Sequence, residues 1–263
     1  MIRICMAGAC GRMGTRILEL AAASEEFDAV SAFDLPERAG AALTLAGGAK
    51  QLTLAANAAE AVAEADALID FTLADVCLPN VRAAVAAGRP AVIGTTGLNE
   101  AQRAELSGLA QQQPIVHAPN MSVGVNLLFK LTREVAALLG LEYNVEITEI
   151  HHNQKKDSPS GTAERLGECA AEGLGLDYGR DAVHGRRGLT GARPERQIGM
   201  HALRGGDVVG EHTVSFVGQG ERVELTHKAH NRDNFARGAL RAARFVTTAR
   251  PGLYDMQDVL GLR

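Results

Sequence analysis

The chain has 263 residues, of which 46% are hydrophobic and 22% are charged, and this globular composition excludes disorder along its whole length. Its net charge of -4 and its 4% aromatic content argue against a nucleic-acid surface built from basic patches and stacked rings. Glycine is in excess, at 29 residues against a usual share of ~7%, which predicts tight turns around an aliphatic core.

The N-terminus and the cysteines indicate the compartment. The apolar run at 1–7 meets glycine at once, which makes it too short for a signal peptide or a membrane span. The four cysteines form no CxxC pair, so neither a disulfide framework nor a metal site is expected. We therefore expect a cytoplasmic protein with no metal, membrane or nucleic-acid partner.

Short apolar runs alternate with helical patterns over the first half of the chain. This alternation predicts βα units and a parallel, doubly wound sheet, an α/β fold of the Rossmann-like type. The strands are expected at 2–7, 29–33, 67–71, 91–93 and 115–117, and the helices at 12–23, 58–65, 76–87 and about 99–112.

The pattern changes after about residue 120. A long amphipathic helix is predicted at 123–139, and 142–152 alternates with the period of a strand. Further strands at 197–203, 208–216 and 222–227, separated by glycine turns, predict an antiparallel meander, followed by a helix at 235–248. We therefore expect a dinucleotide-binding domain at 1–122, completed by 233–263, and an α+β domain at 123–232.

A glycine-rich loop, GACGRMG at 8–14, directly follows the first predicted strand. Glycine there lets the backbone approach a pyrophosphate, which the N-terminus of the next helix can bind. Cys10 stands where many such loops have glycine, so a turn needed only for packing is the alternative. The predicted cofactor contacts are Gly8, Ala9, Cys10, Gly11, Arg12 and Met13.

Three further strand ends support a nucleotide site. Asp34 ends the second strand, where an acid binds the adenosine ribose and repels a 2′-phosphate, which favours NAD over NADP. In a parallel sheet, ligands bind beyond the carboxyl ends of the strands. The other two predicted cofactor loops contain Gly94, Thr95 and Thr96, and then Ala118, Pro119, Asn120 and Met121.

The segment at 149–163, EIHHNQKKDSPSGTA, holds the second candidate site. Histidine can transfer protons near neutral pH, and Lys155 can supply positive charge and a proton. Gly161 and Thr162 stand near a predicted helix start, whose N–H groups can bind a carboxylate. Adjacent histidines on a strand face opposite sides, so His151 and His152 are expected to have different roles if the strand continues through both. The alternative is a polar strand end followed by a capped helix.

The motifs together resemble the 4-hydroxy-tetrahydrodipicolinate reductase (dihydrodipicolinate reductase) family over essentially the whole chain. The resemblance rests on GACGRMG at 8–14, DFT at 70–72, GTTG at 94–97 and the segments at 118–126 and 149–163, with GEHT at 210–213 and HKA at 227–229. The segment at 149–163 is the most specific of these.

The resemblance implies NAD(P)H-dependent reduction of a cyclic dicarboxylate in lysine and diaminopimelate biosynthesis, by a homotetramer whose mixed sheets pack across subunits. It implies that His151 is a proton donor or acceptor and Lys155 a proton donor. His152, Gly161 and Thr162 would bind substrate. Leu35 follows Asp34 where many relatives have arginine, so we expect NADH to serve at least as well as NADPH. Lys156 adjoins Lys155, which leaves the lysine assignment dependent on register.

Two other functions are compatible with parts of the pattern. One is another two-domain nicotinamide reductase that acts on a semialdehyde or a sugar, although no cysteine stands where an acyl-enzyme would form. The other is a nicotinamide-redox sensor without catalysis, although no helix-turn-helix or basic helix is visible.

Overall fold

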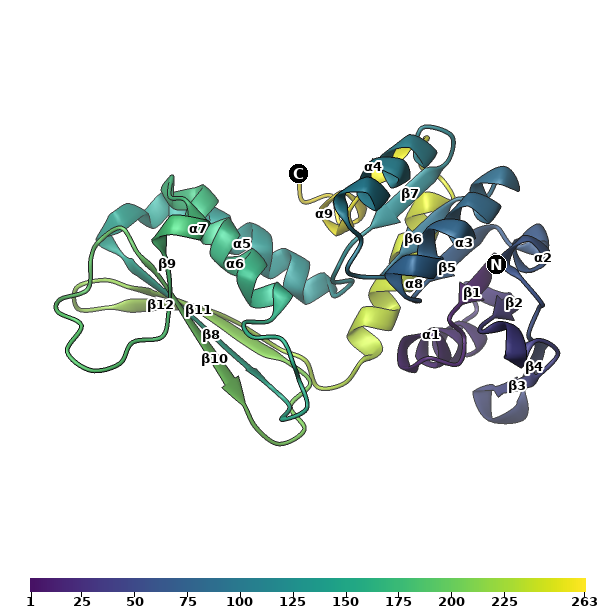
Figure 1. Cartoon of the computed structure of the whole chain (residues 1–263), viewed down its shortest axis with the longest axis horizontal. Coiled ribbons are helices and arrows are strands. Elements are labelled where there is room, and N and C mark those ends of the chain that lie inside the picture. The colour runs from purple at the N-terminus through teal and green to yellow at the C-terminus, as the bar shows by residue number, and fades with distance from the viewer. The chain divides into compact units, whose positions relative to one another are not determined.

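The computed structural model describes all residues from 1 to 263. The chain divides into two compact units, the first made of Met1–Val123 and Arg232–Arg263 and the second of Gly124–Asn231. Each unit has its own sheet (Figure 1). No helix is long and apolar enough to cross a membrane.

The first unit is built on a six-stranded sheet with the order β13-β7-β6-β5-β1-β2. Every neighbouring pair is parallel, which confirms the predicted Rossmann-like sheet. The strands are β1 (Ile2–Ala7), β2 (Phe27–Phe33), β5 (Ala67–Asp70), β6 (Ala91–Ile93), β7 (Pro114–His117) and β13 (Gly252–Tyr254).

Helices cover both faces of this sheet, because successive strand residues alternate between two apolar clusters. Ile4 and Met6 pack with α1 and α8, whereas Cys5 and Ala7 pack with α3 and α4. The helices are α1 (Arg12–Ala22), α2 (Ala58–Ala61), α3 (Ala74–Ala86), α4 (Glu100–Leu109), α8 (Asp233–Val246) and α9 (Met256–Val259), with short 3-10 turns at Pro36–Arg38, Ala46–Gly48 and Val62–Glu64.

Two features of the first unit were not predicted. An antiparallel hairpin of β3 (Ala42–Leu45) and β4 (Lys50–Thr53) follows β2, and β13 extends the sheet beside β7. The residues of these strands are mostly exposed or half-buried, so they lack the continuous apolar run that marks the equally short, fully buried β6.

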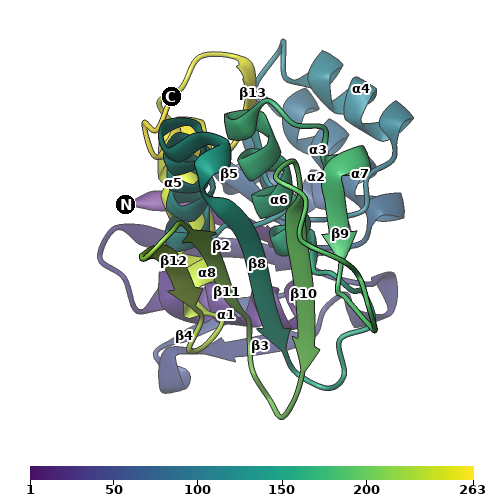
Figure 2. The same cartoon turned by 90° about the vertical axis from the view of Figure 1, so that its left-hand side faces the viewer.

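The second unit has a mixed, five-stranded sheet with the order β12-β11-β8-β10-β9. Its inner face packs with α5 and α6 around Val145, Ile147, Ile198 and Val214, and Figure 2 shows both helices on the same side of the sheet. The elements are α5 (Val123–Leu139), β8 (Asn144–His151), α6 (Gly161–Leu174), α7 (Tyr178–Asp181), β9 (Ala182–His184), β10 (Ile198–Arg204), β11 (Glu211–Val217) and β12 (Arg222–Lys228), with a 3-10 turn at Gly140–Glu142.

The predicted meander is wrong in one essential respect. β10 and β11 do not pair with each other; they lie on either side of β8, β10 parallel to it and β11 antiparallel. The chain passes from β8 through α6 before it reaches β10, and such a crossover places the next strand parallel. Only β11 and β12 form the expected hairpin.

The segment between β10 and β11 explains this error. Residues 208–210, expected to be part of a strand, belong to a loop that crosses the end of β8. The loop is bound there by backbone hydrogen bonds, from His152 N–H to the Val208 carbonyl (2.8 Å) and from Gly205 N–H to the His151 carbonyl (2.9 Å). The glycines at 205–206 therefore carry the chain over β8 rather than into a hairpin.

Candidate active site

The loop between β1 and α1 can adopt its tight turn only because it is rich in glycine. A Cβ at Gly14 would lie 2.1 Å from the Gly8 carbonyl oxygen, and one at Gly8 would lie 2.6 Å from the Phe71 carbonyl oxygen. Gly8 also has φ +77°, a conformation that side chains disfavour. Gly11 is the N-cap residue of α1 and has no side chain that could accept a hydrogen bond. The first N–H groups of this 11-residue helix therefore are not bound by a capping side chain and remain directed at the loop.

Asp34 lies at the end of β2, beside this loop. Its carboxylate accepts hydrogen bonds from Cys10 N–H (2.8 Å) and Leu35 N–H (2.9 Å). Arg38 Nε lies 3.8 Å from the same carboxylate and has a half-exposed side chain. The acid therefore stands at the edge of the glycine loop, as predicted for a residue that binds ribose hydroxyls.

Asp70, at the end of β5, joins two neighbouring loops. The Asp70 side chain is fully buried and accepts hydrogen bonds from the hydroxyls of Thr72 and Thr95, both at 2.7 Å, and from the Asn80 amide at 2.8 Å. Thr72 N–H donates in turn to Thr95 Oγ1 (2.8 Å). Asp70 was expected only as part of the DFT motif, yet its carboxylate holds the loop that contains Thr95.

The loops after β6 and β7 complete this edge of the sheet. A Cβ at Gly94 would lie 2.2 Å from the Phe71 ring, so only glycine fits there. The loop after β7 is held by Ala118 N–H, which donates to the Ile93 carbonyl, and by Ser122 N–H, which donates to Asn120 Oδ1. The predicted cofactor residues thus follow the carboxyl ends of four parallel strands, and the cradle of glycines fits a dinucleotide.

The second set of candidate residues begins at the end of β8. His151 is the last residue of that strand and is buried, whereas His152 already lies in the following loop and is half-buried. The two histidines therefore do not alternate along one strand. His151 Nδ1 lies 2.6 Å from Glu149 Oε2, two residues earlier on the same buried face. Burial lowers the pKa of His151, and the Glu149 carboxylate opposes this only in part.

Glu149 is buried and is surrounded by hydrogen-bond donors. Arg204, on β10, donates to both carboxylate oxygens at 2.7 and 2.9 Å, and Ser160 N–H donates to Oε1 at 3.0 Å. Burial alone would raise the pKa of Glu149, but the hydrogen bonds from Arg204, His151 and Ser160 outweigh burial and lower it. The carboxylate is therefore ionised at neutral pH.

Lys155 lies in the loop after β8, and its position distinguishes it from its neighbour. Its Nζ lies 2.9 Å from Asp157 Oδ2, its side chain is 20% exposed, and its N–H donates to the His152 carbonyl. Lys156 is exposed. Of the two lysines, Lys155 is the one held by the loop.

The start of α6 provides a candidate carboxylate site. Gly161 and Thr162 are its first two residues, as predicted, and Ser160 caps the helix through Ala163 N–H. The Ser160 hydroxyl also lies 3.0 Å from His212 Nε2. Helix α6 has 14 residues, so its N-terminus favours a bound anion.

His212, on β11, was quoted in a sequence motif without a role. Its ring lies edge-on to that of His151, with centroids 5.1 Å apart and an interplanar angle of 75°. Burial lowers the pKa of His212 to about 3, so it is neutral at physiological pH. Together with Arg204 it is a site residue that sequence reasoning missed, because both approach His151 through pairings distant in sequence.

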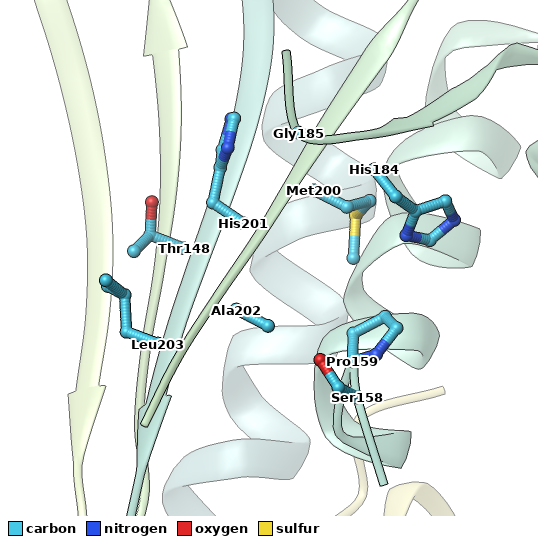
Figure 3. A pocket seen from close by; sticks show the side chains of 9 residues that line it. All are labelled: Thr148, Ser158, Pro159, His184, Gly185, Met200, His201, Ala202 and Leu203. Atoms are coloured by element: carbon cyan, nitrogen blue, oxygen red, sulfur yellow. The ribbon is translucent and has the colours of Figure 1, made fainter. Parts of the chain in front are cut away.

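A separate cavity of about 670 Å³ lies at the edge of β10, beyond the end of the short strand β9. Figure 3 shows Thr148, His201 and Leu203 on one side of the strand and His184, Ser158 and Pro159 on the other. None of the predicted site residues lines it. It is therefore distinct from the histidine site at the end of β8.

The parallel sheet with its glycine loops, joined in one chain to a unit with a buried histidine, a lysine and a helix start, is the arrangement expected of a nicotinamide-dependent oxidoreductase. Comparisons with known proteins specify the family. The family model described as dihydrodipicolinate reductase, N-terminus, matches residues 2–121, and the one described as dihydrodipicolinate reductase, C-terminus, matches residues 124–260.

Full-length relatives agree with these matches. The 4-hydroxy-tetrahydrodipicolinate reductase of Syntrophotalea carbinolica is 49% identical over 267 residues, and that of Geotalea uraniireducens is 50% identical over 270; each comparison covers 100% of both chains. The solved structure of dipicolinate-bound dihydrodipicolinate reductase from Paenisporosarcina sp. TG-14 has a TM-score of 0.79 at 24% identity, covers 98% of each chain and supports the fold. The chain belongs to the 4-hydroxy-tetrahydrodipicolinate reductase family.

Membership establishes the activity as an NAD(P)H-dependent reduction of a small cyclic dicarboxylate in lysine and diaminopimelate biosynthesis. It confirms the resemblance recognised in the sequence motifs. The reductase of the predicted family is therefore preferred over a redox sensor without catalysis.

Proposed function

We propose that the loops after β1, β2, β6 and β7 hold the reduced nicotinamide cofactor. We further propose that the end of β8 and the start of α6 hold the substrate and supply its proton. The observation that carries this proposal is that His151 and the α6 N-terminus meet at one buried carboxylate, Glu149, while Lys155 lies in the loop between them and is close enough to lower the pKa of His151. This arrangement combines proton donors with an anion site.

The cofactor residues have distinct parts in this proposal. The N–H groups at the start of α1 bind the pyrophosphate, and Asp34 binds the adenosine ribose. The side chains held by Asp70, above all Thr95, shape the loop beside the nicotinamide. Because Asp34 repels a 2′-phosphate and Leu35 adds no positive charge, NADH serves at least as well as NADPH.

When bound, the reduced nicotinamide supplies a hydride, after which the product needs a proton. His151 and Lys155 provide that proton and stabilise the negative charge that precedes its transfer. Gly161 N–H and Thr162 bind one substrate carboxylate at the start of α6, and His152 binds a second polar group of the substrate. A general acid of this kind contributes ~10²–10⁴-fold to the rate.

The cysteines support a mechanism without a thiol nucleophile. Cys77 and Cys169 are buried within α3 and α6. Burial raises the pKa of both thiols, that of Cys169 to about 11, so neither is a thiolate at neutral pH. This disfavours the alternative reductase that forms an acyl-enzyme.

The assembly and compartment form part of the same proposal. The outer face of the mixed sheet carries no helix of its unit, and it presents the half-exposed Leu203 beside Ile150, its neighbour on β8. At the tip of the loop between β9 and β10, Leu189 is fully exposed. We infer that these apolar groups are covered in a homotetramer and that the enzyme acts in the cytoplasm, where it draws on the nicotinamide pool.

Replacement of Lys155 by Ala tests the catalytic assignment. With saturating reduced cofactor, we expect kcat to fall by about a hundredfold or more, because a general acid is lost. Lys156→Ala is the matched control: its side chain is exposed one residue further along, and we expect near wild-type turnover. Wild-type turnover in Lys155→Ala, or a larger loss in Lys156→Ala, would remove Lys155 from the mechanism.

A further inference from the structure

A buried glutamate on a core-facing strand position requires an explanation. In β8 the same face carries Val145 and Ile147, which belong to the apolar core of the unit, and then Glu149 and His151. Burying a carboxylate is costly unless donors compensate it. Four hydrogen bonds do so here: two from Arg204, one from Ser160 N–H and one from His151.

These donors come from separate elements that meet at the end of β8. The register places Arg204 of β10 directly beside His151, and His212 of β11 directly opposite Glu149. Arg204 also donates to the Asp157 carbonyl at 2.7 Å, which ties the loop that carries Lys155 to the same carboxylate. The cluster is therefore a built arrangement around His151 rather than an isolated ion pair.

We propose that Glu149 is a positioning residue for His151: held by Arg204 and by the Ser160 amide, its carboxylate fixes the neutral imidazole with a proton on Nδ1. The lone pair of Nε2 is then free to take up a proton, which the resulting imidazolium donates from Nε2 in the reaction. This inference rests on the proposed role of His151. Because Nδ1 donates to a fixed acceptor, the neutral ring has one tautomer and one orientation, as in histidines held by a carboxylate at other sites.

The far side of the imidazole supports Nε2 as the working nitrogen. A Cβ at Gly210 would lie 2.9 Å from His151 Nε2, so the loop that crosses β8 passes close to this nitrogen at a residue that has no side chain. His212 packs edge-on against the ring and fixes its plane without adding charge. Each of the two nitrogens thus has a different environment.

Arg204 gives the arrangement a second property, which is control of the pKa of His151. The charged or titratable groups that face this imidazole are Glu149, Arg204, Lys155 and His212. Glu149 raises the pKa of His151, whereas Arg204 and Lys155 lower it. Burial is the largest cause of the lowered pKa, and Arg204 opposes part of the carboxylate's effect while its two hydrogen bonds keep the carboxylate in place.

Two substitutions test this balance because they act in opposite directions. Glu149→Gln removes the carboxylate and leaves Arg204 unpaired, so the pKa of His151 falls by about one unit or more. Arg204→Met leaves an uncompensated carboxylate, so the same pKa rises. We expect kcat to fall at least about tenfold in Glu149→Gln with a smaller change in KM. A general loosening of the fold would instead expose His151 and raise its pKa in both variants.

The readout is NMR of the chain labelled with ¹⁵N-histidine, with the His151 signals assigned by comparison with His151→Asn. In the wild type, we expect the neutral ring to carry its proton on Nδ1. Glu146→Gln is the control, since Glu146 lies on the opposite face of β8 with its own partners, Arg186 and Arg193, and it should leave the His151 titration unchanged. Arg204→Lys keeps the positive charge and should give a smaller shift than Arg204→Met.

Several results would overturn the inference. They are a wild-type imidazole protonated on Nε2, shifts of the same sign in Glu149→Gln and Arg204→Met, or a pKa of His151 that neither variant moves. If Glu149→Gln fails to fold, the tautomer of His151 in the wild type and the pKa of His151 in the Arg204 variants still test the inference. The tautomer and the titration need no turnover, so they separate this inference from the proposed role of His151 in catalysis, which the activity of His151→Asn tests.

Discussion

At the scale of single residues, glycines and one acid determine the shape of the loops at the carboxyl edge of the parallel sheet. Gly14 lies against the Gly8 carbonyl and Gly94 lies against the Phe71 ring, so side chains at either position would overlap atoms already in place. The sequence predicted these glycines from their spacing after strands. It did not predict the role of Asp70, because its partners Thr72, Thr95 and Asn80 come from two loops and from helix α3 and meet only in the folded unit.

Gly14→Ala tests whether the loop needs this close approach. The added Cβ would lie 2.1 Å from the Gly8 oxygen, so the loop must shift, at a cost of about 1–3 kcal/mol in the free energy of unfolding. We expect NADH affinity, measured by fluorescence titration, to fall well below that of the wild type, and urea unfolding to report the loss of stability.

Gly108→Ala is the matched control for this substitution. Gly108 lies within α4, where a Cβ meets nothing within 4 Å, so alanine should leave NADH affinity unchanged and keep or raise stability by up to about 1 kcal/mol. If Gly14→Ala bound NADH as tightly as the wild type and Gly108→Ala, the loop would not be the cofactor cradle.

At the scale of elements, β8 organises the second unit. It lies at the centre of the mixed sheet, between a parallel and an antiparallel neighbour, and its carboxyl end holds His151. The strand itself follows from its alternation of buried and half-buried residues. The positions of its neighbours were not predictable from the sequence. β10 follows β8 only after a helical crossover, and it pairs with residues some fifty positions earlier in the chain. This is why Arg204 and His212 could not be placed beside His151 from the sequence.

The uncovered outer face of this sheet predicts the oligomeric state. Light scattering after size-exclusion chromatography should give four times the 27.7 kDa mass of one chain. Leu203→Asp places a charge on the outer face and should lower that mass by breaking contacts between copies. Leu138→Asp, at the exposed end of α5, is the control and should leave the assembly intact. A wild-type monomer, or a tetramer unaffected by Leu203→Asp, would contradict the proposed interface.

At the scale of the whole molecule, we propose that the two units carry two different parts of the chemistry. The first repeats βα units over most of its length and so was predictable from periodicity, apart from the short strands β3, β4 and β13. The second has a fold in which the long helix α5 and strand β8 were predictable but the strand order was not. Most of the candidate site residues could be proposed from the sequence because they stand at a strand end or a helix start, where the local sequence carries the signal; Lys155, in the loop between β8 and α6, was proposed from its motif.

The central claim is that this chain oxidises a reduced nicotinamide only when its cyclic dicarboxylate substrate is present, and that Asp34 makes NADH a suitable donor. The direct measurement is the steady-state rate of loss of the absorbance of the reduced nicotinamide, with each cofactor in turn, on addition of 4-hydroxy-tetrahydrodipicolinate. The account predicts substrate-dependent oxidation with kcat/KM for NADH at least equal to that for NADPH. Absence of substrate-dependent oxidation, or a preference for NADPH by about tenfold or more, equal to ~1.4 kcal/mol in the transition state, would contradict it.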